Sequence, residues 1–111
     1  MKESVKVLDE AKDLQISKAK VYNGGSVKQA DYYPHGMASI YDMLNTKLLR
    51  IRSILDQTAS NPAYKPEYES LEDSLKDLIN YASFGVSYAR GKLEGQNPNR
   101  DILNRETNVK R

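Results

Sequence analysis

The sequence has no cysteine, no tryptophan, only one histidine and no hydrophobic run long enough to span a membrane. Without cysteine there are no disulfide bonds, no thiolate metal sites and no cysteine nucleophile. A lone His35 also argues against a histidine-based metal site or a Ser-His-Asp triad. Any chemistry must then rest on carboxylates, lysine, arginine and tyrosine. Because MKESVKVLDEAKD lacks the apolar core of a signal peptide, we expect a cytoplasmic protein with no membrane segment.

The charges nearly balance, with 17 basic and 15 acidic residues and a net charge of +2. This balance argues against a protein that binds long nucleic acids, which would carry a basic excess on one face. The chain is polar for its length of 111 residues, with 39% hydrophobic residues and a mean hydropathy of −0.72. Such a composition is typical of a small domain that keeps one face polar, or that buries its apolar face only by oligomerising. Together with the broad apolar stripes of the three helices predicted below, it leads us to expect a homodimer or a homotetramer that assembles through the second and third helices.

Helical periodicity occurs in three segments, residues 4–22, 37–57 and 70–92, and no long segment has the two-residue period of a strand. The sequence predicts an all-α fold, a small bundle of three main helices over residues 1–92, followed by a polar C-terminal tail over 93–111. The residues expected to be buried are Val5, Leu8, Ala11 (or Lys12) and Gln15 or Ile16 in the first helix, Ile40, Met43 or Leu44, Leu48, Ile51, Ile54 and Leu55 in the second, and Leu71, Leu75, Leu78, Ile79, Ala82, Val86 and Ala89 in the third.

The third segment, ESLEDSLKDLINYA, carries the strongest functional signal. As a helix it places a polar row on one side, made of Glu69, Asp73, Asp77 and Asn80. Like charges one turn apart repel each other, so a positive group should lie beside Asp73 and Asp77. We consider a divalent metal ion, or the basic side chains of Lys47 and Arg50 on the neighbouring helix.

Two structural alternatives explain parts of this row. Ser70 can cap the third helix with Asp73 at the N3 position, as in a capping box. An acidic first turn is also favoured by the helix dipole, which accounts for Glu69, Glu72 and Asp73. It accounts poorly for Asp77, which lies deeper in the helix and precedes the apolar stretch LINYASFGV.

The basic residues Lys47 and Arg50 lie three apart at the edge of the apolar stripe of the second helix. They suit an ion pair with Asp73 or Asp77, or a contact with a phosphate group. The stretch KAKVYNGGSVKQADYYPHG adds basic and aromatic residues that could line one mouth of a site, namely Lys18, Lys20, Tyr22, Tyr32, Tyr33 and His35.

The order of these motifs resembles a known family. A lysine-rich helix ending in a tyrosine-glycine loop, then HG before TKLLRIRSIL, then ESLEDSLKDLINYA, is similar to nucleotide-modification-associated, MazG-like proteins of phages and bacteria. Their relatives form the all-α nucleoside triphosphate pyrophosphohydrolase superfamily. The resemblance spans about residues 14–92.

The resemblance implies a helical dimer or tetramer that binds a nucleotide and Mg²⁺ between its helices and releases pyrophosphate. Carried over by residue, it implies metal ligation by Glu72, Asp73 and Asp77, phosphate contacts from Lys47, Arg50 and Lys18, contact of Asn80 with metal-bound water or the nucleotide, and a place for Tyr22 or Tyr33 near the base or sugar. The catalytic set would then be Asp73, Asp77, Lys47 and Arg50, with Lys18, Tyr22, Tyr33 and Asn80 binding the nucleotide.

The second helix departs from the family pattern. MazG-type enzymes carry an E-E-x-x-E cluster there, whereas SIYDMLNTKLLRIR has no glutamate and offers only Asp42 and Asn45. The alternative hypothesis is therefore a non-catalytic helical oligomer that binds a nucleotide or a partner protein, as a phage accessory or regulatory protein would.

Overall fold

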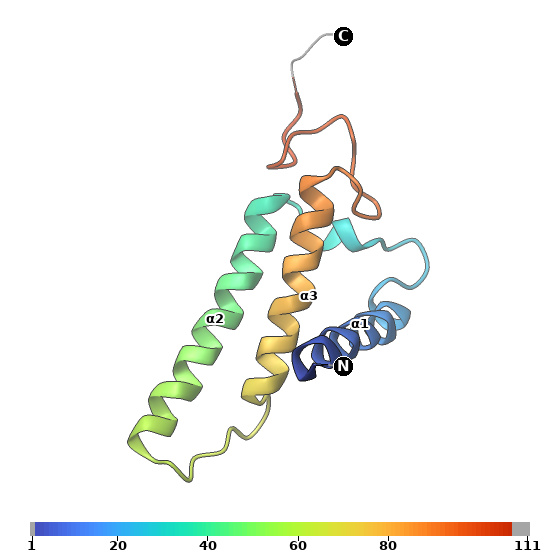
Figure 1. Ribbon diagram of the computed structural model, residues 1–111. Helices are drawn as coiled ribbons and strands as arrows, with labels where there is room; N and C mark the ends of the chain where they lie inside the picture. The colour runs from blue at the N-terminus through green and yellow to red at the C-terminus, as the bar shows by residue number, and fades with distance from the viewer. Residues whose placement is uncertain (1, 108–111) are drawn as a thin grey trace.

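The computed structural model describes residues 2–107 and consists of three α-helices and one short 3-10 helix (Figure 1). Helix α1 spans Glu3–Tyr22, η1 spans Gln29–Tyr32, α2 spans Met37–Ser60 and α3 spans Leu71–Ala89. Within residues 2–107 no strand forms beyond an isolated bridge between Arg100 and Glu106. The prediction of an all-α fold with three main helices is confirmed. In the same residues no helix has both the length and the apolar character that crossing a bilayer requires.

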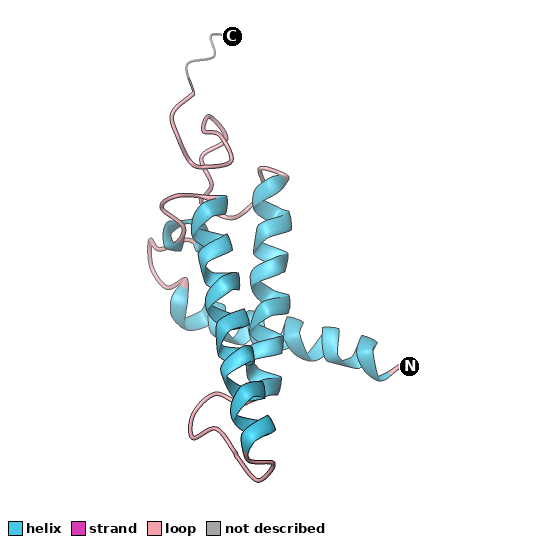
Figure 2. Cartoon of the chain, turned by 90° about the vertical axis from the view of Figure 1, so that its left-hand side faces the viewer, coloured by secondary structure: helices cyan, strands magenta, loops and turns pink. Residues whose placement is uncertain are grey.

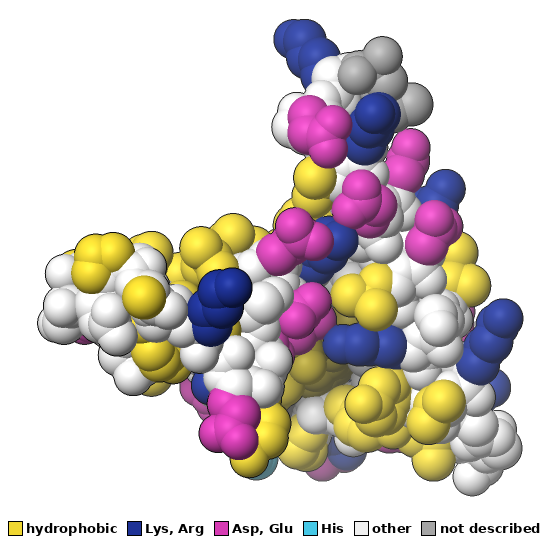
Figure 3. Space-filling view, turned by 90° about the horizontal axis from the view of Figure 1, so that it is seen from below, with side chains coloured by type: hydrophobic (Ala, Val, Ile, Leu, Met, Phe, Trp, Pro, Cys, Tyr) yellow, Lys and Arg dark blue, Asp and Glu magenta, His cyan; other side chains and the backbone are white. Residues whose placement is uncertain are grey.

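Helices α2 and α3 form an antiparallel pair, while α1 crosses α3 and projects away from the pair (Figures 1 and 2). The contacts of α1 are mainly with α3, so α2 is covered by a helix on one side only. The molecule is elongated, measuring 59 × 29 × 29 Å along its principal axes. Helices α2 and α3 thus form one layer with two faces, and α1 crosses α3 as a projecting arm that bears charges of both signs (Figure 3).

The apolar core is small and lies at one end of the α2–α3 pair. Tyr33, Ile40, Tyr88 and Leu93 form a buried cluster, in which Ile40 is fully inaccessible. Partly buried side chains pack around it, namely Ala30, Met37, Met43, Leu44 and Phe84. Since burial of apolar area is the main stabilising term in folding, this end anchors the fold. It also fixes Tyr33 beside the site described below.

The predicted apolar stripe of α3 is wrong in part, since Leu71, Leu78 and Ile79 are half-buried and the other four residues are exposed. Leu75 and Val86 are 45% and 51% exposed, and Ala82 and Ala89 are exposed as well. The buried residues of α3 are instead Ser74, Asp77, Asn80 and Tyr88. The polar side turns inward because α1, α2 and the chain before α3 supply hydrogen-bonding and charged partners for it, which removes the cost of burying polar groups.

The predicted stripes of α1 and α2 are wrong in part. Of the α1 stripe only Ala11 is buried, because α1 packs mainly against α3 and this contact covers little of its surface. In α2, Ile40 and Ile54 are buried as predicted, whereas Leu48 and Leu55 are 54% and 52% exposed. Helix α1 begins one residue before the predicted segment 4–22, with Lys2 at its N-cap position.

Residues 93–107, the described part of the predicted tail, lie against η1 and the start of α2. The backbone N–H of Ala30 donates to the carbonyl of Glu94 at 2.9 Å, and that of Met37 donates to the carbonyl of Ile102 at 2.8 Å. The side chain of Asn104 donates to the carbonyl of Pro34 at 3.0 Å. This segment therefore braces the loop that carries Tyr33. The remainder of the predicted tail, 108–111, lies outside the described residues.

Candidate functional site

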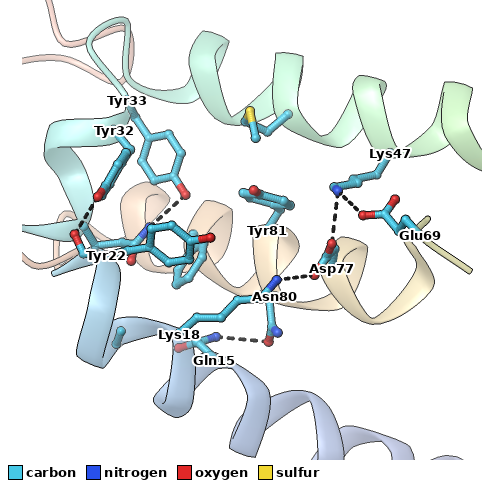
Figure 4. Close-up of a pocket in the computed structure, with 14 residues that line it drawn as sticks. Gln15, Lys18, Tyr22, Tyr32, Tyr33, Lys47, Glu69, Asp77, Asn80 and Tyr81 are labelled. Carbon is cyan, nitrogen blue, oxygen red and sulfur yellow. Dashed lines mark hydrogen bonds and ion pairs between the residues drawn. The ribbon is translucent and has the colours of Figure 1, made fainter. Parts of the chain in front are cut away.

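A cleft of about 470 Å³ lies between α1, α2 and α3, and η1 closes one side of it (Figure 4). It is lined by Gln15, Lys18, Ala19, Tyr22, Gln29, Tyr32, Tyr33, Met43, Lys47, Glu69, Asp77, Asn80, Tyr81 and Phe84. Charged side chains gather at one end and aromatic rings at the other (Figure 4). The volume falls in the range of sites for small molecules and cofactors.

Lys47 organises the charged end. Its ammonium group lies 2.7 Å from Oε1 of Glu69 and 3.0 Å from Oδ2 of Asp77. Burial alone would lower the pKa of Lys47, but its hydrogen bonds to both carboxylates outweigh burial and raise it. The amine is therefore a fixed cation and not a nucleophile or a base.

Glu69 is held just before α3 by three groups. Besides Lys47, the hydroxyl of Ser74 donates to Oε2 of Glu69 at 2.6 Å, and Nε of Arg50 lies 3.5 Å from the same oxygen. Burial would raise the pKa of Glu69, but the hydrogen bonds from Lys47 and Ser74 prevail and lower it to about 2. Arg50 also donates to the backbone carbonyl of Glu69 at 2.8 Å, which ties α2 to the start of α3.

The arm α1 is attached to α3 through polar contacts that also form the wall of the cleft. Nζ of Lys18 lies 3.0 Å from Oδ1 of Asp77, so each oxygen of Asp77 pairs with one lysine. Nε2 of Gln15 donates to Oδ1 of Asn80 at 3.2 Å and to the hydroxyl of Ser83 at 2.9 Å. Asn80 lines the cleft, and because Gln15 donates to its oxygen, its amide NH₂ is the group that can donate to a ligand.

Aromatic rings form the opposite end. Tyr22 and Tyr32 meet edge to face with centroids 6.3 Å apart, and Tyr81 meets Phe84 in the same manner at 6.2 Å. Tyr33 lies beside Phe84 at 6.3 Å. Rings from α1, η1 and α3 thus surround a space suited to a planar group.

A chain of amides sets the orientation of the Tyr33 hydroxyl. Asn23 donates to Oε1 of Gln29 at 3.2 Å, and Nε2 of Gln29 donates to the hydroxyl of Tyr33 at 3.0 Å. Burial raises the pKa of Tyr33 to about 12, against a lowering by the Gln29 bond, so the phenol stays protonated. Since its oxygen already accepts from Gln29, the Tyr33 proton is available to a ligand.

The structure brings together most of the residues that the sequence singled out for nucleotide binding. Lys18, Tyr22, Tyr33, Lys47, Asp77 and Asn80 all line the cleft, as does Tyr32. Arg50 lies behind the charged end, where it pairs with Glu69 and with neither predicted aspartate. Lys20 and His35 are not among the lining residues. The expected ion pair between Lys47 and Asp77 is confirmed.

The predicted metal ligands do not come together. Asp73 forms the capping box with Ser70, accepting the Ser70 backbone N–H at 3.2 Å while its own N–H donates to the Ser70 hydroxyl at 3.0 Å. Glu72 is exposed and pairs with Lys76 at 2.9 Å. Asp77 is neutralised by two lysines.

A hard cation such as Mg²⁺ prefers several converging oxygen ligands. Among the described residues, no group of three or more Asp, Glu or His side chains converges in that way. The side chains present therefore do not fit the proposed Mg²⁺ site, and the oxygens of Asp77 and Glu69 already have cationic partners.

Several lining residues were not recognised as site residues from the sequence. Gln15, Gln29, Tyr81 and Phe84 contribute an amide or a ring to the cleft. Gln15 could have been identified, because it lies three residues before Lys18 and so shares its helical face. Gln29 could not, since its role depends on how the loop before α2 folds back toward α1.

The comparisons with known proteins found no match: no family model, no curated protein and no solved structure resembles this chain significantly. The MazG-like resemblance therefore stays a prediction from the sequence.

Proposed function

We propose that the cleft binds a nucleoside or nucleotide without cleaving it. The observation that carries this proposal is the juxtaposition of an aromatic enclosure with inward-facing donors in one cleft of about 470 Å³. Planar bases stack on tyrosine rings, and base and sugar oxygens accept from groups such as the Tyr33 hydroxyl and the Asn80 amide. The ligand is therefore one that presents several hydrogen-bond acceptors on a flat ring.

The charged end of the cleft limits how many phosphate groups the ligand can carry. Lys47 is 17% exposed at its side chain and shared by two carboxylates, whereas Lys18 is 45% exposed and, within residues 2–107, forms an ion pair only with Asp77. A phosphate group thus finds its accessible cation at Lys18. Because Lys18 and Lys47 are already paired with Asp77 and Glu69, little uncompensated positive charge is left for a triphosphate, which favours a nucleoside or a monophosphate.

Pyrophosphate release from a nucleoside triphosphate is the other function that the sequence predicts. In that reaction Lys47 and Arg50 would stabilise charge on the phosphate oxygens, and a metal ion would activate water. The support for catalysis is weaker than that for binding, because Glu72, Asp73 and Asp77 point to different surroundings.

The experiment is calorimetric titration with nucleosides, monophosphates and triphosphates, with and without Mg²⁺, together with ³¹P NMR of the same samples. We expect saturable heats for at least one nucleoside or monophosphate, no requirement for Mg²⁺ and no pyrophosphate. Pyrophosphate formation that disappears in Asp77→Asn would instead establish the hydrolase.

A matched pair of variants ties binding to the cleft. Tyr81→Ala removes a lining ring and should weaken binding at least about tenfold, whereas Tyr68→Ala removes a ring that is 84% exposed and outside the cleft. Equal affinities of the two variants, or no binding by the wild type, would contradict the proposal.

A further inference from the structure

Two side-chain amides lie behind the aromatic end of the cleft and lead to the hydroxyl of Tyr33. Asn23 follows α1 as its C-cap, Gln29 begins η1, and Tyr33 is the C-cap of η1. Nδ2 of Asn23 donates to Oε1 of Gln29 at 3.2 Å, and Nε2 of Gln29 donates to the Tyr33 hydroxyl at 3.0 Å. We call these three side chains the amide relay. Because Tyr33 lines the cleft, the relay decides what this hydroxyl offers to a ligand (Figure 4).

The far end of the amide relay has no fixed partner. Oδ1 of Asn23 is buried and has no hydrogen-bond partner within residues 2–107. Over the same residues, the side chain of Gln29 forms only its two relay bonds. No other hydrogen bond therefore holds either amide in its present orientation.

The amide relay can run in the opposite direction with the same number of hydrogen bonds. The oxygen and nitrogen ends of an amide are almost equal in size, so turning both amides over exchanges donors and acceptors without displacing their neighbours. Tyr33 then donates to Oε1 of Gln29, and Nε2 of Gln29 donates to Oδ1 of Asn23. Either direction leaves one end of the Asn23 amide buried and unpaired, so the two directions carry a comparable desolvation cost.

Reversal inverts the hydrogen bond that Tyr33 offers to the cleft. In the observed direction its oxygen accepts from Gln29 and its proton is left for an acceptor on the ligand. In the reversed direction its proton goes to Gln29, and its oxygen accepts from a donor on the ligand. Burial raises the pKa of Tyr33 to about 12, so the phenol is neutral in both directions and no proton is gained or lost.

We infer that the amide relay lets the cleft bind both oxo and amino bases, with Asn23 and Gln29 as positioning residues for Tyr33. An oxo base has a carbonyl acceptor where the corresponding amino base has an NH₂ donor, and the adjacent ring nitrogen inverts in the opposite sense. A hydroxyl fixed as a donor would select one of the two, since the wrong base leaves a buried polar group unpaired. The inference rests on the proposed function and adds the class of base to it.

Two substitutions lock the amide relay in the reversed direction. In Asn23→Asp the carboxylate can only accept, so Nε2 of Gln29 must donate to it and Oε1 of Gln29 must take the Tyr33 proton. In Gln29→Glu the new carboxylate accepts from both Asn23 and Tyr33. In both variants Tyr33 can only accept from the ligand, so both should favour amino bases.

The measurement is calorimetric titration with cytidine and uridine and with adenosine and inosine, two pairs that exchange an amino for an oxo group. In at least one pair, we expect the wild type to bind the two members with affinities within about tenfold of each other. In both variants, this ratio should shift at least about tenfold toward the amino member. A general loss of stability weakens both members of a pair alike, so the ratio reports on the relay.

Asn61→Asp is the matched control. Asn61 is the C-cap of α2, as Asn23 is of α1, but it is exposed and does not line the cleft. The control should keep the wild-type ratio although it adds the same charge at a helix C-terminus.

The outcomes separate this inference from the proposed function. A wild type that binds only one member of each pair would overturn the inference alone, as would a folded Asn23→Asp or Gln29→Glu with an unchanged ratio, or an equal shift in Asn61→Asp. A wild type that binds none of the four nucleosides or their monophosphates would overturn the proposed function, and the inference with it.

Discussion

Nζ of Lys47 lies 3.0 Å from Oδ2 of Asp77, and this contact joins α2 to α3 at the charged end of the cleft. The other carboxylate oxygen of Asp77 pairs with Lys18 of α1 at the same distance. One side chain therefore links all three helices. Because the Asp77 side chain is only 11% exposed, the cost of removing its charge from water is offset by two cations.

Asp77→Asn should destabilise the fold markedly. The substitution leaves Lys47 near the carboxylate of Glu69 but removes the partner of Lys18 and half the negative charge around Lys47. We expect a loss of about 2 to 3 kcal/mol in the free energy of unfolding, measured by urea denaturation. The matched variant Asp73→Asn weakens only the capping box and should cost about 0.5 to 1 kcal/mol. Equal losses would show that Asp77 has no special structural role.

Stability should fall in acid because of Glu69. Its pKa is lowered from the model-peptide value of 4.5 to about 2 in the folded protein, so its contribution is complete above pH 4.5 and is lost as the pH falls toward 2. Allowing for solvent screening, we expect it to account for roughly 1 to 2 kcal/mol.

Glu69→Gln is the variant that isolates this contribution. The free energy of unfolding of the wild type should decline more steeply between pH 4.5 and 2 than that of Glu69→Gln. Parallel pH profiles of the two proteins, measured by urea denaturation at each pH, would rule out Glu69 as the titrating group.

Local rules predicted the helices and a positive partner for Asp77, with Lys47 as one of the candidates, but they wrongly expected the apolar side of α3 to be buried. Helix α3 has apolar residues on one side and Asp77 and Asn80 on the other, and pattern alone assigns the apolar side to the core. The observed choice depends on partners distant in sequence, such as Gln15 and Lys18, which convert a polar side into a satisfied interface.

The hydroxyl of Tyr33 should matter for the ligand more than for the fold. Tyr33→Phe keeps the ring but removes the donor and leaves Nε2 of Gln29 without its acceptor, which should cost about 1 kcal/mol of stability. The affinity for the best nucleoside should fall roughly five- to tenfold, measured by calorimetry. Tyr68→Phe is the control, because its side chain is exposed and lies outside the cleft. An unchanged affinity of Tyr33→Phe would mean that this hydroxyl does not contact the ligand.

Gly36→Ala should weaken the contacts by which residues 93–107 brace the loop before α2. Gly36 has a φ of +60°, and a Cβ there would lie 2.5 Å from the carbonyl oxygen of Ile102 and 2.6 Å from the hydroxyl of Tyr88. The control is Gly25→Ala, since Gly25 has a similar φ of +64° and open space around it. A positive φ strains alanine in both variants, and Gly36 also has a ψ of −128°, so Gly36→Ala should lose roughly 2 kcal/mol more than Gly25→Ala through this strain and overpacking. If the brace is what yields, trypsin should cut Gly36→Ala at Arg100 faster than it cuts Gly25→Ala; equal cleavage and equal stability would show that the close packing around Gly36 contributes nothing.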